Sequence, residues 1–131
     1  MLPAERAARM QPNRALIDAG VLVAGGSDWP VSETPDPWQG IHGLVTRADP
    51  LGRAPGTLWP EQAISLEEAI AVFTLNAATA MGLGAERVAH HRQVGGLRDL
   101  DRDPFTVPTD TLVETTVLET WFAGRRVYAR A

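Results

Sequence analysis

A glycine-rich turn followed by an aspartate is the part of this sequence best suited to chemistry. Residues 25–30 read Gly-Gly-Ser-Asp-Trp-Pro and follow the apolar run of residues 21–24. An aspartate at the carboxyl end of a buried parallel strand stands where α/β enzymes place catalytic groups. Asp28 is therefore the candidate catalytic residue. On position alone, a loop acid that caps nearby backbone amides fits it equally well.

Three other motifs fail when they are compared with the chemistry that they imitate. A nucleophile elbow built on Ser27 needs glycine at position 29, which holds Trp29. The dinucleotide-binding glycine pattern that begins at Gly82 has Arg87 in its sixth position. The aspartates of residues 99–103 imitate a calcium loop, but proline follows them where the sharp turn needs glycine. None of the three is predicted to be a site.

The histidines are weak candidates for metal ligands. His90 and His91 are neighbours in the sequence, and their side chains diverge in either a helix or a strand, so the two are not expected to bind one ion together. His42 lies on a predicted helix and is interpreted as a surface or capping histidine.

The elements expected before and around Asp28 are those of an α/β protein. Residues 1–19 predict a helix that Pro12 interrupts, with a second helix beginning near Asn13 and ending at Gly20. The unalternating apolar run of residues 21–26 predicts a strand covered on both faces, as in a parallel sheet. Asp28 then lies in a loop at the end of that strand.

The rest of the chain predicts further helices and a terminal hairpin. Apolar spacing favours a helix over residues 38–47, and a loop follows. Ser65 and Glu68 form a capping box that begins a helix expected to run to Gly82. Residues 113–129 alternate as a hairpin does, with Ala123-Gly124 as its turn.

Residues 85–103 show no clean period between these elements. The stretch that precedes Asp101 holds paired glycines, an arginine and an aspartate, and its β-propensity is low. We therefore expect this segment to pair badly as a strand.

Composition limits the class of protein. With 131 residues, 44% of them apolar, the chain is long enough to bury a core. It has no cysteine, and all of its 12 basic residues are arginine, which excludes thiolate and Schiff-base chemistry. A net charge of −4 argues against nucleic acid as a partner. No membrane span or secretory leader is recognised, which predicts a cytoplasmic protein that does not bind membranes.

Several segments together carry a resemblance to a known family. They are residues 20–30, the Thr46-Arg47 pair, residues 66–69 with the helix behind them, residues 100–105, and Val127-Tyr128. In their order and approximate spacing they resemble the C-terminal end of amidohydrolase family 3, whose members are metal-dependent hydrolases of non-peptide carbon–nitrogen bonds. The resemblance covers nearly the whole chain, and Gly-Ser-Asp-Trp-Pro is its most specific part.

The resemblance implies an α/β fold: the C-terminal part of a TIM-barrel amidohydrolase plus strands of its small β-domain. Residues 1–84 are then the last helix–strand–helix units of the barrel, and residues 85–131 a partial C-terminal β-domain segment. It implies that Asp28 is a metal ligand that also accepts a proton from metal-bound water. Trp29, Pro30 and Ser32 are expected to line the mouth of the site, although ordinary loop packing explains these three residues equally well. The implied cofactor is a divalent metal, zinc by preference, and the implied substrate a small amide-type molecule.

The same resemblance predicts that the site is incomplete in this chain. A complete barrel takes about 200–250 residues, whereas this chain has 131, and the family's other histidine and lysine ligands have no counterpart in it. Asp28 alone falls short of the roughly three protein ligands of a catalytic metal. We therefore expect an amidohydrolase-like chain that is active only if other segments complete it. The alternative is a non-catalytic fragment or interaction module. The apolar strand of residues 21–24, without neighbours, predicts self-association.

Overall fold

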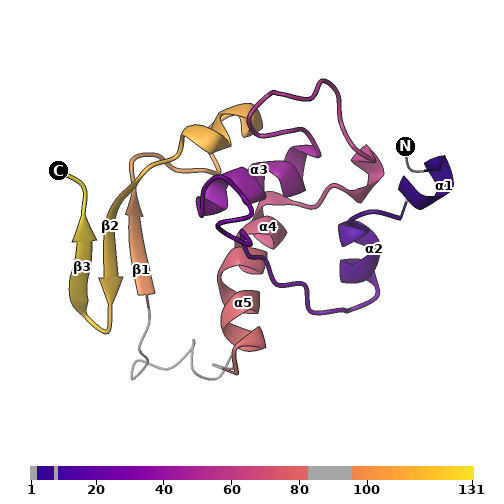
Figure 1. The fold of residues 1–131 in the computed structure, drawn as a ribbon. Helices are drawn as coiled ribbons and strands as arrows, with labels where there is room; N and C mark the ends of the chain where they lie inside the picture. The colour runs from indigo at the N-terminus through magenta and orange to yellow at the C-terminus, as the bar shows by residue number, and fades with distance from the viewer. Residues whose placement is uncertain (1–2, 8, 83–95) are drawn as a thin grey trace.

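The computed structural model describes residues 3–7, 9–82 and 96–131. Short helices come first in the chain and a small sheet comes last (Figure 1). In chain order the elements are α1 (Ala4–Ala7), α2 (Asn13–Asp18), α3 (Pro37–Thr46), the 3-10 helix η1 (Pro60–Gln62), α4 (Leu66–Phe73), α5 (Leu75–Ala80), β1 (Gly96–Leu100), the 3-10 helix η2 (Thr109–Glu114), β2 (Val117–Phe122) and β3 (Arg125–Ala129). Among the described residues, no helix is both long and apolar enough to cross a bilayer.

The N-terminal helices follow the proline and glycine signals of the sequence. Pro12 directly precedes α2, as predicted, and the chain turns at Gly20, whose φ is +73°. A guanidinium–carboxylate pair holds α2 against α4, because Arg14 Nη1 lies 2.7 Å from Glu68 Oε2. This ion pair ties the first part of the chain to the central helices.

Two side-chain caps fix where the central helices begin. The Asp36 carboxylate accepts a hydrogen bond from the Trp38 backbone N–H at 3.0 Å, and α3 starts at Pro37. The predicted capping box is confirmed at α4: Ser65 Oγ accepts from the Glu68 N–H at 3.2 Å, and Glu68 Oε2 accepts from the Ser65 N–H at 2.8 Å. These caps satisfy backbone donors that have no partner inside the helix.

The helix expected to run from the capping box to Gly82 is divided in two. Thr74, with φ −127° and ψ −88°, separates α4 from α5. Its hydroxyl donates to the Ile70 carbonyl at 2.7 Å. Threonine hydroxyls that bond the carbonyl four residues earlier bend or weaken helices, and this accounts for a break that the apolar spacing did not predict.

The C-terminal strands form one antiparallel sheet in the order β1–β2–β3. The predicted hairpin is confirmed over residues 117–129, with Ala123 and Gly124 both at positive φ in the turn between β2 and β3. The first residues of the predicted range, Val113 and Glu114, lie in η2 instead. The expectation that the preceding segment pairs badly is wrong for residues 96–100, because β1 pairs with β2 from Gly96↔Phe122 to Leu100↔Val117. Pairing of a strand depends on its neighbours more than on intrinsic propensity, and β2 pairs with β1 along its length with one register shift, between Asp99 and Leu100.

The core lies between α3, α4 and η2. Its buried apolar residues are Trp38, Ile41, Ile64, Ala69, Val72 and Leu112. Gly40 allows α3 and α4 to approach closely, because a Cβ at this position would overlap the ring of Phe73 in α4. Gly25 lies against the same helix, since a Cβ there would come within 2.9 Å of Val72 Cγ1.

The strand predicted for residues 21–26 is not present. Every strand pairing among the described residues is antiparallel, and none includes this segment. Its backbone is bound by helices instead: the Gly25 N–H donates to the Val72 carbonyl at 3.0 Å, and Asn76 Nδ2 donates to the Val23 carbonyl at 2.9 Å. A parallel strand needs neighbouring strands, and the described part of the chain provides none beside it. The observed architecture is therefore short helices with a three-stranded antiparallel sheet.

Candidate functional site

Asp28 lies in an exposed turn. Its backbone φ is +55°, in the left-handed region, and its carbonyl accepts a hydrogen bond from the Val31 N–H at 2.8 Å. Ser27 Oγ accepts from the Trp29 N–H at 3.2 Å. These backbone contacts define the turn, and the Asp28 side chain is exposed to solvent.

The three residues expected to line the mouth of the site share this loop. Trp29 has 62% of its surface exposed, and the peptide bond between it and Pro30 is cis. Pro30 is exposed, whereas Ser32 is half-buried and donates to the Thr34 carbonyl at 3.0 Å. Their role as lining residues stays a prediction, because the loop is open to solvent.

The described residues do not by themselves fit a metal ion. Within residues 3–7, 9–82 and 96–131, no three histidine, aspartate or glutamate side chains are grouped so that they could hold one. His90 and His91 lie outside the described residues. Of the aspartates that imitate a calcium loop, Asp101 accepts from the Thr116 N–H at 2.8 Å and Asp103 from the Phe105 N–H at 2.9 Å. Both carboxylates are therefore engaged in hydrogen bonds to the backbone.

His42 is buried, so its interpretation as a surface or capping residue is wrong. Its Nδ1 lies 3.4 Å from Thr46 Oγ1. Burial lowers the pKa of His42, and the Asp110 and Asp49 carboxylates oppose that shift. The sequence held a signal for this burial, because Trp38, Ile41 and His42 are spaced as one helix face. His42 is thus a core residue.

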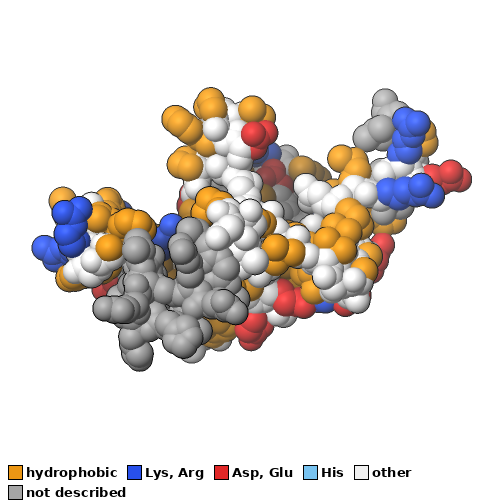
Figure 2. Space-filling model, turned by 90° about the horizontal axis from the view of Figure 1, so that it is seen from below, with side chains coloured by type: hydrophobic (Ala, Val, Ile, Leu, Met, Phe, Trp, Pro, Cys, Tyr) orange, Lys and Arg blue, Asp and Glu red, His pale blue; other side chains and the backbone are white. Residues whose placement is uncertain are grey.

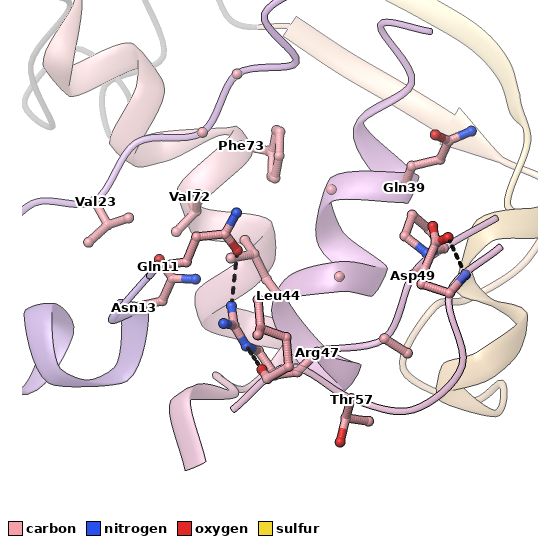
Figure 3. Close-up of a pocket in the computed structure, with 18 of the residues that line it drawn as sticks. Gln11, Asn13, Val23, Gln39, Leu44, Arg47, Asp49, Thr57, Val72 and Phe73 are labelled. Carbon is pink, nitrogen blue, oxygen red and sulfur yellow. Dashed lines mark hydrogen bonds between the residues drawn. The ribbon is translucent and has the colours of Figure 1, made fainter. Parts of the chain in front are cut away.

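A cleft of about 780 Å³ lies beside the glycines that precede Asp28. It is lined by Val23 to Gly26, by residues of α3 and α4, and by the loop of residues 48–58, together with Gln11, Asn13 and Arg47 (Figure 3). Asp28, Trp29, Pro30 and Ser32 are not among the lining residues. The predicted site and the cleft are therefore adjacent in the sequence without coinciding.

Arg47 is the polar residue of this cleft that sequence reasoning missed as a site. Only 5% of its surface is exposed. Burial lowers the pKa of its guanidinium, and the carboxylate of Glu61 partly offsets the shift. The Thr46-Arg47 dipeptide in the sequence gave no sign that Arg47 is buried, because arginine is mostly exposed in proteins.

The chain is similar in sequence to known proteins of one family. The model of the family described as "Amidohydrolase family" matches residues 1–128. The chain is 36% identical over 123 residues to N-substituted formamide deformylase from Arthrobacter pascens. That alignment covers 93% of this chain but 22% of the relative, so the chain spans about a fifth of the relative's length. No solved structure matches the chain significantly.

Proposed function

Because the chain belongs to the amidohydrolase family, we propose that it forms the C-terminal part of a TIM-barrel hydrolase of non-peptide carbon–nitrogen bonds. The observation that carries the proposal is the family match over residues 1–128, which includes Asp28. The name of the Arthrobacter relative makes N-substituted formamides the first substrates to test. A cytoplasmic location and the absence of nucleic-acid and membrane partners remain predictions.

Asp28 is the proposed catalytic residue of this chain. Its exposed carboxylate is available to groups from outside the chain, and a positioned carboxylate can accept a proton in hydrolysis. Trp29, Pro30 and Ser32 are proposed to border the substrate. Their support is that they share the Asp28 turn, and that Trp29 leaves most of its surface free for contact.

The metal centre is proposed to need residues from beyond this chain. The family is generally metal-dependent, and zinc is the proposed ion. Catalytic zinc takes about three protein ligands, whereas Asp28 is a single carboxylate, and the part of the chain that the structure describes offers no group of three. The remaining ligands must come from other segments, so the chain alone is proposed to be inactive.

A second candidate is a non-catalytic fragment or interaction module. The absence of a three-ligand group among the described residues favours it. So do exposed apolar side chains near Asp28, which include Val21, Leu22, Trp29 and Val31. Figure 2 shows hydrophobic side chains in several places on one face of the molecule.

Complementation separates the two candidates. The 131-residue chain is assayed with zinc and an N-substituted formamide, alone and after co-expression with the part of the Arthrobacter enzyme that precedes the matched region. We expect turnover only after co-expression. Asp28→Asn should reduce it by about 10²-fold or more, whereas the matched control Asp110→Asn, at another exposed aspartate, should leave it unchanged.

The other outcomes are equally decisive. Turnover by the isolated chain, with one equivalent of zinc bound, would overturn the proposal that the site is incomplete. A co-expressed pair that forms a stable complex without turnover favours the non-catalytic candidate. Turnover that survives Asp28→Asn removes the proposed role of that carboxylate.

A further inference from the structure

The Arg47 guanidinium is buried with part of its hydrogen-bonding capacity unused. Its Nε donates to the Leu58 carbonyl at 2.9 Å, and its Nη1 donates to Gln11 Oε1 at 3.2 Å. Nη2 is buried and has no hydrogen-bond partner among the described residues. Buried polar atoms nearly always have a partner, so the unused donor calls for an acceptor that the described residues do not provide.

No carboxylate forms an ion pair with this side chain within the described part of the molecule, and Glu61 acts on it only from beyond ion-pair distance. None of the ion pairs found there within 4.0 Å includes Arg47. A buried charge without a paired charge is unfavourable, and arginine is the residue best shaped to bind a carboxylate through two parallel hydrogen bonds. The missing acceptor is therefore expected to be an anion with two oxygens.

The space in front of Arg47 has the composition of a small-molecule site. The cleft of about 780 Å³ has apolar walls that include Val23, Leu44, Val72 and Phe73. Asp49 also lines it, and its carboxylate accepts from the backbone N–H groups of residues 51, 53 and 54. Gln11 lies beside Arg47, and Asn13 also lines the cleft (Figure 3). Pockets that bind small ligands are mostly apolar, with a few convergent polar groups, and have volumes of about 300–1,000 Å³.

We propose that Arg47 anchors a binding site for a small monocarboxylate whose apolar part contacts Val23, Leu44 and Phe73. The Gln11 amide oxygen occupies the place of one carboxylate oxygen, because it already accepts from Nη1. Gln11 is an exposed residue and its contact of 3.2 Å is long for a hydrogen bond to a charged donor. A carboxylate displaces the Gln11 side chain and accepts from both Nη1 and Nη2. The proposal is independent of the proposed hydrolase activity.

Titration of the full 131-residue chain with sodium benzoate, followed by calorimetry, tests the site. Benzyl alcohol serves as the uncharged analogue, and sodium chloride controls for ionic strength. We expect benzoate to bind with one site per chain and the other two to give no saturable signal. Comparable binding of benzyl alcohol would show an apolar cavity without carboxylate recognition, and the absence of benzoate binding would overturn the proposal.

Variants at Gln11 test the geometry without removing the buried arginine. Gln11→Glu supplies an internal carboxylate and should weaken benzoate binding by at least about tenfold, the loss expected when a charge-assisted hydrogen bond is pre-empted. Gln11→Ala removes the internal acceptor and should tighten binding. Gln39→Glu places the same charge on another glutamine that lines the cleft and should weaken binding less than Gln11→Glu does. Equal weakening by the two glutamate variants would reduce the effect to net charge and overturn the site.

Arg47→Gln gives the direct loss of the anchor, checked for folding by far-ultraviolet circular dichroism. A folded Arg47→Gln chain should not bind benzoate, and unchanged binding would overturn the proposal. If this variant does not fold, the Gln11 and Gln39 variants decide the question.

Discussion

Leu112 and Leu22 are the same residue type, but one is fully buried and the other is half exposed. Leu112 lies in the core between α3, α4 and η2 with 0% of its surface exposed. Leu22, in the segment that leads to Asp28, has 51% exposed, and its neighbour Val21 has 48%. The core is closed by elements of this chain, whereas the Asp28 segment has the composition of a buried strand but, among the described residues, no strand beside it. The region proposed for catalysis is thus the less enclosed of the two.

Truncating the two leucines gives the largest contrast. Leu112→Ala should lower the free energy of unfolding by about 2–5 kcal/mol, because it leaves a cavity in a closed core. Leu22→Ala should cost less than about 1 kcal/mol, because much of its side chain is already in water. Urea denaturation followed by circular dichroism measures both, and equal losses would show that the Asp28 segment is as well packed as the core.

Acid titration measures the ion pair that ties α2 to the core. The hydrogen bond from Arg14 and that from the Ser65 backbone lower the pKa of Glu68 below its usual 4.5. The unfolded state then binds more protons than the folded state near pH 4.5, so the stabilisation is complete above that pH and is lost as pH falls through the lowered value.

Glu68→Gln should therefore flatten this part of the stability–pH profile, and the loss at neutral pH should be about 0.5–1 kcal/mol, typical of a partly exposed pair. Denaturation midpoints between about pH 6 and pH 3 measure it, with Glu5→Gln in α1 as the control. A Glu68→Gln profile parallel to that of the unchanged chain would exclude Glu68 as a source of the acid dependence.

The smallest change in the free energy of unfolding is expected for a substitution at exposed Leu22, and it should be accompanied by a change in self-association. We expect the unchanged chain to self-associate through the segment around Val21 and Leu22, whose apolar side chains are exposed and which pairs with no strand among the described residues. Leu22→Ser should reduce association while changing the free energy of unfolding by less than about 0.5 kcal/mol. Size-exclusion chromatography with light scattering over a range of concentrations measures it, with Leu51→Ser as the exposed control. A monomer at every concentration would contradict this expectation.

The sequence predicted best those elements whose signals are local. The capping box of Ser65 and Glu68, the break at Pro12 and the hairpin turn at Ala123-Gly124 are all confirmed, because each rests on hydrogen bonds or backbone angles within a few residues. The strand over residues 21–26 failed because a parallel strand is defined by neighbours, and no local pattern supplies them. β1 was missed for the converse reason, since its partner β2 compensates for its weak propensity.

For the candidate site, the types and order of the residues indicated the family, but they did not show that Arg47 is buried. The family match over residues 1–128 agrees with the resemblance inferred from Gly-Ser-Asp-Trp-Pro and the segments that follow it. The roles of Asp28, Trp29, Pro30 and Ser32 remain predictions, since their loop is exposed. The burial of Arg47 could not be read from the chain, because it arises where the end of α3 meets Leu58 and Gln11, which are distant in sequence. The burial of His42 could have been read from the helix-face spacing that it shares with Trp38 and Ile41.

The packing of α3 against η2 has a consequence for the order of folding. The hairpin of β2 and β3 joins neighbours in sequence, so it can form within about 1–10 μs. The core must instead bring α3 (Pro37–Thr46) to η2 (Thr109–Glu114), which requires closing a long loop of chain. We expect the sheet to form first and the core to close late, so that the apolar faces of α3 and α4 are uncovered in the newly made chain. Chaperones that recognise exposed apolar helices would then meet this chain before its core has closed.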